Sequence, residues 1–253
     1  MSLDRRNFLQ QIGGLTAGMA LLPSFPGLSL HENPADKMFF KISLAQWSFH
    51  KALYAKKMTN MDFPLKAKKD FGIEAVEYVS VFFDGKQKDT NYLKELKKRC
   101  KDNGVKSHLI MVDGMGELAI PNDEERNKAV ENHYQWVEAA KFLGCKTIRV
   151  NAGGSGTPAE MHQAAVDGLA KLATFAMPYK INVVVENHGG NSSNGAWLAG
   201  IMKEINMPNC GTLPDFGNFC IRQEAGTCAE EYDPLHGRFR TDALRQSGKC
   251  KGL

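Results

Sequence analysis

The stretch Ile181–Gly190 (INVVVENHGG) places a carboxylate directly after a short, strongly apolar run. An apolar run of this length, closed by glycines, is typical of a buried strand. Glu186 ends this predicted strand, and Asp215 ends the next one in the same way. In a parallel α/β barrel, catalytic groups come from the carboxyl ends of different strands. Glu186 and Asp215 are therefore placed to share one divalent cation.

Apolar strands alternate with amphipathic helices through most of the chain. Helices are predicted over residues 61–71, 92–103 and 123–143, and a glycine follows each of them, where a left-handed cap needs no Cβ. The repeat of roughly 30–40 residues is the size of one βα unit. The predicted strands cover residues 40–46, 72–78, 106–112, 146–151, 181–186 and 211–215.

This alternation predicts an α/β fold. We expect a (β/α)8 barrel-like arrangement over residues 39–236, incomplete, with about six of the eight βα units. A doubly wound sheet could also stop at six strands. However, residues 47–50 (WSFH) stand where the glycine-rich phosphate loop of such a sheet would follow strand one.

The composition is that of an ordinary globular protein. The 253 residues carry a net charge of +4 and no long basic run, which gives nucleic-acid binding no electrostatic support. The six cysteines form no CxxC motif, and Cys100 and Cys145 fall within helix and strand patterns. We predict that these two are small core residues, and we predict no particular disulfide.

The first residues predict an export signal. Asp4–Gln10 (DRRNFLQ) resembles a twin-arginine motif and precedes a mildly apolar run over residues 12–22. That run is shorter than the roughly 20 residues that a spanning helix needs, so a cleaved segment is favoured over a stable membrane anchor. We expect residues 1–38 to be signal and linker, read by the twin-arginine export machinery, and the protein to be periplasmic or otherwise extracytoplasmic. An ordinary amphipathic first helix is the alternative.

The last residues depart from the pattern of the barrel. Residues 237–253 (GRFRTDALRQSGKCKGL) carry five cationic side chains and show no strand pattern. Codons that could encode this tail, when read one base later, encode a different amino-acid sequence. That sequence has the pattern of a helix followed by a strand, as expected for a seventh βα unit. We therefore expect a frameshift near the codon of Gly237. A naturally shortened variant with a basic tail is the alternative, and the DNA sequence of the locus distinguishes the two.

Polar residues close to the two carboxylates are further candidates for the site. His188 follows Glu186 by two residues, and Asn218 follows Asp215 by three, so each can reach a metal-bound water or a substrate. The alternatives are purely structural roles, namely a salt bridge at the end of the strand for Glu186 and a helix cap for Asp215. His108 lies inside a predicted strand, either as a core histidine or as a contact to substrate.

The remaining candidates lie at or near the ends of the other predicted strands. Trp47 offers either an apolar wall for the carbon face of a sugar or simple core packing. Residues 152–156 (AGGSG) let the backbone approach a ligand closely. Arg149 either contacts substrate or neutralises the carboxylates. The full set of further substrate-binding candidates is Trp47, His50, Glu77, Arg149 and Asn151.

Three motifs carry a family resemblance. They are Gly72–Glu77 (GIEAVE), Val185–Gly190 (VENHGG) and Pro214–Asn218 (PDFGN). In their order and spacing the sequence resembles the sugar phosphate isomerase/epimerase family with the xylose isomerase-like barrel, and more closely its exported, twin-arginine-bearing members. The match covers Phe39 to about Leu235.

The resemblance implies a single divalent metal ion, commonly manganese, magnesium, cobalt or zinc, with ligands from strands five to eight. Glu186 and Asp215 match the ligands of strands five and six. The strand-seven histidine and the strand-eight glutamate have no counterpart in this sequence. Asn218 stands where epimerases of the group often have histidine.

The resemblance also implies a reaction on a sugar or ketosugar, in which the metal stabilises an enediolate while two glutamates remove and return a proton. Glu186 matches one of the two glutamates. We therefore expect an isomerase or epimerase that is impaired in the form of this chain. A non-catalytic sugar-binding protein and a lyase or hydrolase of oxidised sugars are the alternatives. The sequence leaves the sugar, the metal and the oligomeric state open.

Overall fold

The computed structural model describes residues 40–219 and four short segments, 223–224, 227–228, 232–233 and 238–239. The predicted export signal lies outside the described residues, as does the predicted tail except for residues 238–239. The chain divides into two compact units, Met1–Lys41 and Ile42–Leu253, and the description below concerns the second.

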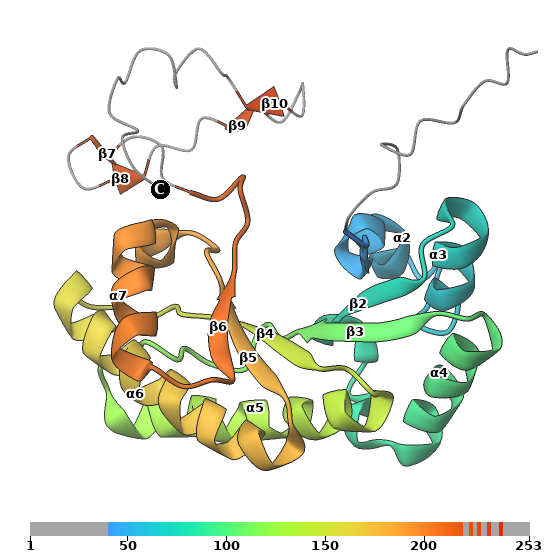
Figure 1. The fold of residues 1–253 in the computed structure, drawn as a ribbon, viewed down its shortest axis with the longest axis horizontal. Coiled ribbons are helices and arrows are strands. Elements are labelled where there is room, and N and C mark those ends of the chain that lie inside the picture. The colour runs from blue at the N-terminus through green and yellow to red at the C-terminus, as the bar shows by residue number, and fades with distance from the viewer. Residues whose placement is uncertain (1–39, 220–222, 225–226, 229–231, 234–237, 240–253) are drawn as a thin grey trace, which may run out of the picture. The chain divides into compact units, whose positions relative to one another are not determined.

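Six parallel strands form one sheet in the order in which they occur along the chain (Figure 1). This order without reversal is that of a barrel, whereas a doubly wound sheet changes direction partway. The predicted α/β barrel-like fold with six units is confirmed. The strands are β1 (Leu44–Ala45), β2 (Ala75–Val79), β3 (Lys106–Met111), β4 (Thr147–Asn151), β5 (Asn182–Glu186) and β6 (Cys210–Leu213).

The helices connect successive strands, and from α3 to α7 each helix packs against the next, whereas α2 lies apart from this row (Figure 1). The predicted helix over residues 123–143 is found with those bounds, and the other two agree within about two residues. The α-helices are α2 (His50–Tyr54), α3 (Phe63–Phe71), α4 (Thr90–Asp102), α5 (Asp123–Leu143), α6 (Pro158–Ala176) and α7 (Gly195–Ile205). Short 3-10 turns are η3 (Gln46–Phe49), η4 (Ser80–Phe83), η5 (Lys86–Lys88), η6 (Met177–Tyr179) and η7 (Gly190–Ser193).

Four more short strands follow as two antiparallel pairs. They are β7 (Gln223–Glu224) with β8 (Thr227–Cys228), and β9 (Tyr232–Asp233) with β10 (Arg238–Phe239). β10 falls within the tail in which the sequence showed no strand pattern, so that part of the prediction is wrong.

The first strand covers only Leu44–Ala45 of the predicted residues 40–46, and a side chain continues its pairing at the carboxyl end. The chain turns into η3 at Gln46, and the Gln46 Oε1 accepts the backbone N–H of Val79 at 2.9 Å. A strand-like contact to the end of β2 is therefore kept, although the backbone of β1 has already ended.

The bounds of two other strands correct the predicted positions of acids. Gly72 is the left-handed cap of α3 (φ 67°), so β2 begins only at Ala75 and continues through Val79. Glu77 therefore lies within β2 and not at its end. β6 stops at Leu213 because Pro214 has no N–H to donate to the ladder, and Asp215 follows two residues later.

Alternation along the strands separates a core face from a polar face. In β4, Ile148 and Val150 are fully buried, while Arg149 and Asn151 point to the other side, as the period of two requires. Cys100 and Cys145 are buried free thiols, which confirms their predicted role as core residues.

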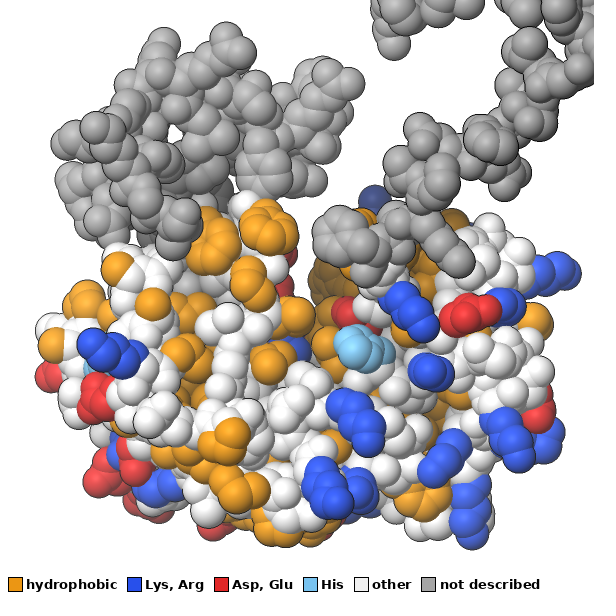
Figure 2. All heavy atoms as spheres, viewed as in Figure 1, with side chains coloured by type: hydrophobic (Ala, Val, Ile, Leu, Met, Phe, Trp, Pro, Cys, Tyr) orange, Lys and Arg blue, Asp and Glu red, His pale blue; other side chains and the backbone are white. Residues whose placement is uncertain are grey.

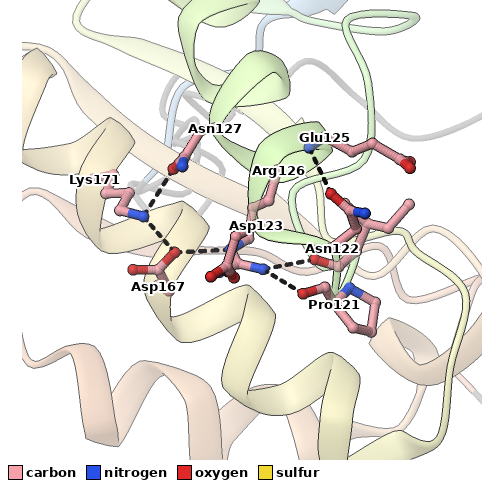
Figure 3. Close-up of polar contacts among 9 residues, drawn as sticks. Pro121, Asn122, Asp123, Glu125, Arg126, Asn127, Asp167 and Lys171 are labelled. Carbon is pink, nitrogen blue, oxygen red and sulfur yellow. Dashed lines mark hydrogen bonds and ion pairs between the residues drawn. The ribbon is translucent and has the colours of Figure 1, made fainter.

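Arg126 joins the start of α5 to α6 (Figure 3). Its Nε donates to Asp167 at 2.7 Å, and its Nη1 donates to the carbonyl oxygens of Ile120 and Pro121 at 2.9 and 3.0 Å. Its Nη2 donates to Asp123. One buried guanidinium therefore satisfies two loop carbonyls and two carboxylates, and it fixes the loop between β3 and α5.

Basic side chains gather over the part of the molecule that contains α3 and α4 (Figure 2). On α4, Lys98 pairs with Asp102 at 2.6 Å and Arg99 with Glu95 at 2.8 Å. Part of this charge is thus balanced on the helix surface itself. Within the described residues, none of the helices has both the length and the apolar character that crossing a membrane demands.

Candidate active site

Glu186 closes β5 on the polar face of the sheet. It pairs in register with Asn151 of β4 and Leu213 of β6, and it is only 9% exposed. Beside it lies a cavity of about 370 Å³ that Glu186 and Asp215 line together with Met111, Leu213, Pro214, Phe216 and Gly217. The structure therefore places the two acids that the sequence singled out at the same cavity, beyond the carboxyl ends of adjacent parallel strands.

A buried arginine holds two acids below this cavity. Arg149 is 5% exposed, and its Nη1 donates to Asp113 Oδ1 at 2.7 Å. Its Nε lies 2.6 Å from Glu186 Oε2, but this N–H makes no hydrogen bond, so the contact with Glu186 is an ion pair only. Asn151 donates to the same Asp113 oxygen at 2.9 Å. Arg149 thus neutralises carboxylates, which was one of the two interpretations of this residue.

The surroundings of Glu186 change its acidity. Burial raises the pKa of this carboxyl, the charges of Arg149 and His188 lower it, and those of Asp215 and Asp113 raise it again. The net result is a pKa above the ordinary value of 4.5. A buried carboxyl group with a raised pKa at a cavity is a candidate for taking up and releasing a proton.

Asp215 is held by a side-chain amide that makes the hydrogen bonds of a neighbouring strand's backbone. The fully buried Asn187 donates its Nδ2 to the backbone oxygen of Asp215 and accepts the Asp215 N–H on its Oδ1, both at 2.7 Å. This pair of hydrogen bonds continues the ladder between β5 and β6 beyond its last backbone contact. The position of Asp215 is therefore tied to that of Glu186, one residue before Asn187.

The carboxylate of Asp215 closes a turn. Its Oδ1 accepts the N–H of Gly217 at 2.7 Å, and its Oδ2 accepts the side-chain amide of Asn218 at 3.1 Å. The alternative of a helix cap is wrong for the described residues, because the chain forms a turn and not a helix after Asp215. Each oxygen retains a lone pair, so the carboxylate can still bind a cation.

The donor set of the cavity fits a cation that prefers oxygen. Glu186 and Asp215 supply two carboxylates, and in the part of the chain that the structure describes no group of three His, Cys, Asp or Glu could hold a metal ion. Mg²⁺ is commonly bound by one or two carboxylates together with several waters. The two carboxylates therefore fit a divalent cation whose remaining ligands are water or substrate oxygens.

The candidates from the first two strands lie apart from this cavity. Trp47 is 48% exposed and stacks on His50 with the ring centres 4.8 Å apart, and His50 Nδ1 contacts the Trp47 carbonyl at 2.8 Å. Glu77 accepts a hydrogen bond from Ser43. These residues belong to β1, η3 and β2, with β3 between them and the strands that carry Glu186 and Arg149.

Two of the three candidate histidines, His108 and His188, are exposed. His108 lies on β3 opposite a register shift between Val76 and Glu77 of β2, which interrupts the alternation and turns its side chain outward. Its interpretation as a core histidine is therefore wrong. The loop of His188 is fixed through its backbone N–H, which donates to Ser192 Oγ at 3.0 Å.

The glycines after β4 allow the loop that follows β4 to pack closely against the loop that follows β3. A Cβ on Gly154 would lie 2.4 Å from the backbone oxygen of Ala119, and the Gly153 oxygen accepts the N–H of Ala119 at 2.8 Å. The space beside both glycines is occupied by the loop that follows β3. The expected close approach is therefore real, but its partner is the protein backbone.

Sequence reasoning missed Asp113 and Asn187. Asp113 follows the predicted strand over residues 106–112, so the strand-end rule that selected Glu186 would also have selected it. Asn187 carried no comparable signal, because an amide after a strand has many uses and only the fold shows which backbone it meets.

Comparisons with solved structures agree with this architecture. The chain is similar to the probable 3-DHS dehydratase AsbF of Bacillus anthracis, with 18% identity and a TM-score of 0.57 over 71% of this chain and 64% of that one. A D-psicose 3-epimerase solved in the presence of D-fructose gives 14% identity and a TM-score of 0.59, covering 74% of this chain and 67% of that one. At these identities the likeness shows the fold alone. The chain spans less than two thirds of the dehydratase.

A magnesium complex of a xylose isomerase-like TIM barrel protein from Mycobacterium smegmatis is also similar, with 13% identity and a TM-score of 0.55 over 74% of this chain and 69% of that one. No curated protein sequence matches the chain. The family model described as "Xylose isomerase-like TIM barrel" matches residues 65–244, which is most of the chain and includes both Glu186 and Asp215. The chain therefore belongs to the xylose isomerase-like TIM barrel family.

Proposed function

We propose that this protein acts on a sugar or ketosugar by proton transfer at the carbon next to a carbonyl, as an isomerase or epimerase. The observation that carries the proposal is the cavity lined jointly by Glu186 and Asp215. One of these acids is buried with a raised pKa, and the backbone of the other is fixed by the side-chain amide of Asn187. The membership of the family and the fold shared with an epimerase support it.

In this proposal Glu186 is the group that moves the proton. Arg149 limits the rise in the pKa of Glu186 and holds its carboxylate at the cavity wall. Asn187 holds the backbone of Asp215, and Asn218 holds its carboxylate, at the same cavity. A divalent cation bound by the two acids would polarise the substrate carbonyl and so acidify the neighbouring C–H.

Elimination of water is the second candidate reaction. It begins with the same proton abstraction next to a carbonyl, and the fold is shared with a probable dehydratase as well as with an epimerase. The two reactions leave different products. Analysis of the products formed from a panel of ketosugars and oxidised sugars separates them.

Metal titration tests the proposed site. We expect Mg²⁺ or Mn²⁺ to bind the full chain with one-to-one stoichiometry in a calorimetric titration. Glu186→Gln and Asp215→Asn should each weaken this binding at least about tenfold, because each removes one of the two charged ligands. Glu131→Gln, which changes an exposed glutamate of α5, is the matched control and should bind as the wild type does.

Exchange of substrate hydrogen with solvent deuterium tests the proton transfer separately. Since Glu186 is the only glutamate that lines the described cavity, we expect exchange to be slow in this chain and to be lost in Glu186→Gln. Metal binding that is indifferent to both acid substitutions, or exchange that persists in Glu186→Gln, would overturn the proposal.

A further inference from the structure

The cavity beside Glu186 also has an apolar wall, which the function proposed above does not use. Its described lining residues other than the two acids are Met111, Leu213, Pro214, Phe216 and Gly217. Sites for small molecules are typically lined by apolar and aromatic side chains, with a few polar groups that fix the orientation of the ligand. The two carboxylates supply polar groups here, so the apolar residues are left to contact the carbon atoms of a ligand.

Phe216 is the most exposed residue of this wall. It is 78% exposed, the largest value for a large apolar residue in the described part of the chain, whereas Met111 at the same cavity is only 9% exposed. An exposed phenylalanine forgoes most of the free energy that burial of its ring would provide. A ligand that covers the ring would recover that free energy.

The turn that carries Phe216 is fixed on both sides of this residue. Before it, the side-chain amide of Asn187 makes two hydrogen bonds of 2.7 Å to the backbone of Asp215. After it, the Gly217 N–H donates to Asp215 Oδ1 at 2.7 Å, and the Asn218 N–H donates to the Asp215 carbonyl at 3.2 Å. The backbone of Phe216 is therefore in place before a ligand arrives, which lowers the cost of ordering the site on binding.

An aromatic ring beside two carboxylates matches the surface of a sugar. A sugar presents hydroxyl groups, which carboxylates accept, and faces of C–H groups, which an aromatic ring attracts because its own face carries partial negative charge. Trp47, which the sequence offered as such an apolar wall, lies on η3 and outside the lining of this cavity. Phe216 has the position that Trp47 lacks.

We propose that Phe216 is a specificity-determining residue, whose ring packs on the C–H face of a neutral ketohexose while the hydroxyl groups of the sugar face Glu186 and Asp215. Epimers differ in the face on which their hydroxyl groups lie, so the ring favours those epimers that turn C–H groups toward it. This inference rests on the proposed function only in taking a ketosugar as the ligand. It concerns binding and is tested without turnover.

The probes are the four D-ketohexoses, D-fructose, D-psicose, D-tagatose and D-sorbose, added singly to the full chain. In saturation-transfer NMR with irradiation of the aromatic protons, we expect at least one sugar to bind saturably and to receive saturation on the C–H groups of one face. Phe216→Ala should lower the affinity for that sugar about 3- to 10-fold, remove this transfer and reduce the differences in affinity among the four sugars. The transfer reports on Phe216 because it is the one aromatic residue among the described residues that line the cavity.

Two variants control for loss of structure. Phe216→Tyr keeps the ring and should retain the affinity within about 2-fold. Phe71→Ala removes another exposed phenylalanine, which ends α3 outside the cavity, and should bind the sugar as the wild type does. Since Phe216 is exposed, Phe216→Ala should unfold at the same denaturant concentration as the wild type, so that its loss of affinity reports on the contact with the sugar.

The outcomes separate this inference from the proposed function. Equal affinities of the wild type and Phe216→Ala, or binding of none of the four sugars, would refute the role of Phe216. Sugar binding that depends on Phe216 but is accompanied by no exchange of substrate hydrogen would support this role and contradict the proposed reaction. Exchange together with an affinity that is indifferent to Phe216→Ala would do the reverse.

Discussion

Single buried side chains decide the electrostatics of this fold. Arg149 is shared between Asp113 and Glu186, and removing its charge would leave two acids near the cavity without their cation. Breaking a buried ion pair in this way typically costs about 3–5 kcal/mol, mainly because the remaining charges stay desolvated. The same desolvation keeps Glu186 more basic than an exposed glutamate.

His133 predicts how stability depends on pH. This histidine of α5 is 2% exposed and donates from Nδ1 to the Ala129 carbonyl at 2.7 Å. Burial lowers its pKa below 6.5, although the Ala129 carbonyl and the charge of Asp113 oppose this effect. The unfolded chain therefore binds a proton that the folded chain resists, and the free energy of unfolding falls as pH drops below 6.5.

Replacing His133 should flatten this dependence. In urea titrations of the full chain at a series of pH values, we expect the decline below pH 6.5 to be smaller in His133→Gln than in the wild type. Identical declines in the two proteins would show that His133 is not responsible.

At the scale of elements, close packing of α6 on the loop before α5 depends on one glycine. A Cβ on Gly168 would lie 2.3 Å from the backbone oxygen of Leu118 and 3.3 Å from the Arg126 side chain. Backbone cannot move aside as a flexible side chain can. The loop that Arg126 ties down thus leaves room for no larger residue at this point of α6.

Gly168→Ala should therefore lower the free energy of unfolding by about 1–3 kcal/mol, although alanine is the better helix former. Gly195→Ala at the start of α7 is the matched control, since its Cβ would meet only the Phe219 ring at an ordinary 3.8 Å. We expect the control to change stability by less than about 0.5 kcal/mol. A Gly168→Ala protein as stable as the wild type in denaturant would contradict the packing argument.

Much of the element level could be predicted because it depends on local patterns. Apolar runs and glycine caps gave α5 at its observed bounds and gave six parallel strands, because those signals are read within a few residues. Strand ends were less accurate, since Gln46 and Pro214 end pairing through contacts or missing donors that periodicity does not report.

The candidate site could be predicted only for residues whose positions follow from the order of the strands. Glu186 and Asp215 share a cavity because their strands are neighbours, which the order of the units implies. The positions of His108 and of the glycines after β4 depended on a register shift and on a neighbouring loop. Neither the register shift nor the position of the loop can be predicted from the residues of these segments alone.

At the scale of the whole molecule, the predicted export signal has a direct test. We propose that the twin arginines Arg5 and Arg6 direct export of the chain. Changing both to lysine should keep the protein in the cytoplasmic fraction of a bacterial host, with a size that shows no cleavage. Lys88→Gln, which leaves both arginines in place, is the control and should be exported as the wild type is. Export of the double variant at the wild-type level would contradict the assignment.

The order of the sheet has a consequence for how the protein is made. Every strand from β2 to β5 pairs with the strands immediately before and after it in the chain. Each pairing nevertheless spans a whole βα unit, as between Leu44 and Val76, so a loop of about 30 residues must close before two strands can pair. Each βα unit emerging from the ribosome finds its docking partner already in place, so assembly can keep pace with synthesis. The newest strand is always one edge of the sheet, and β1 remains the other edge throughout synthesis, so both edges are exposed to chance association.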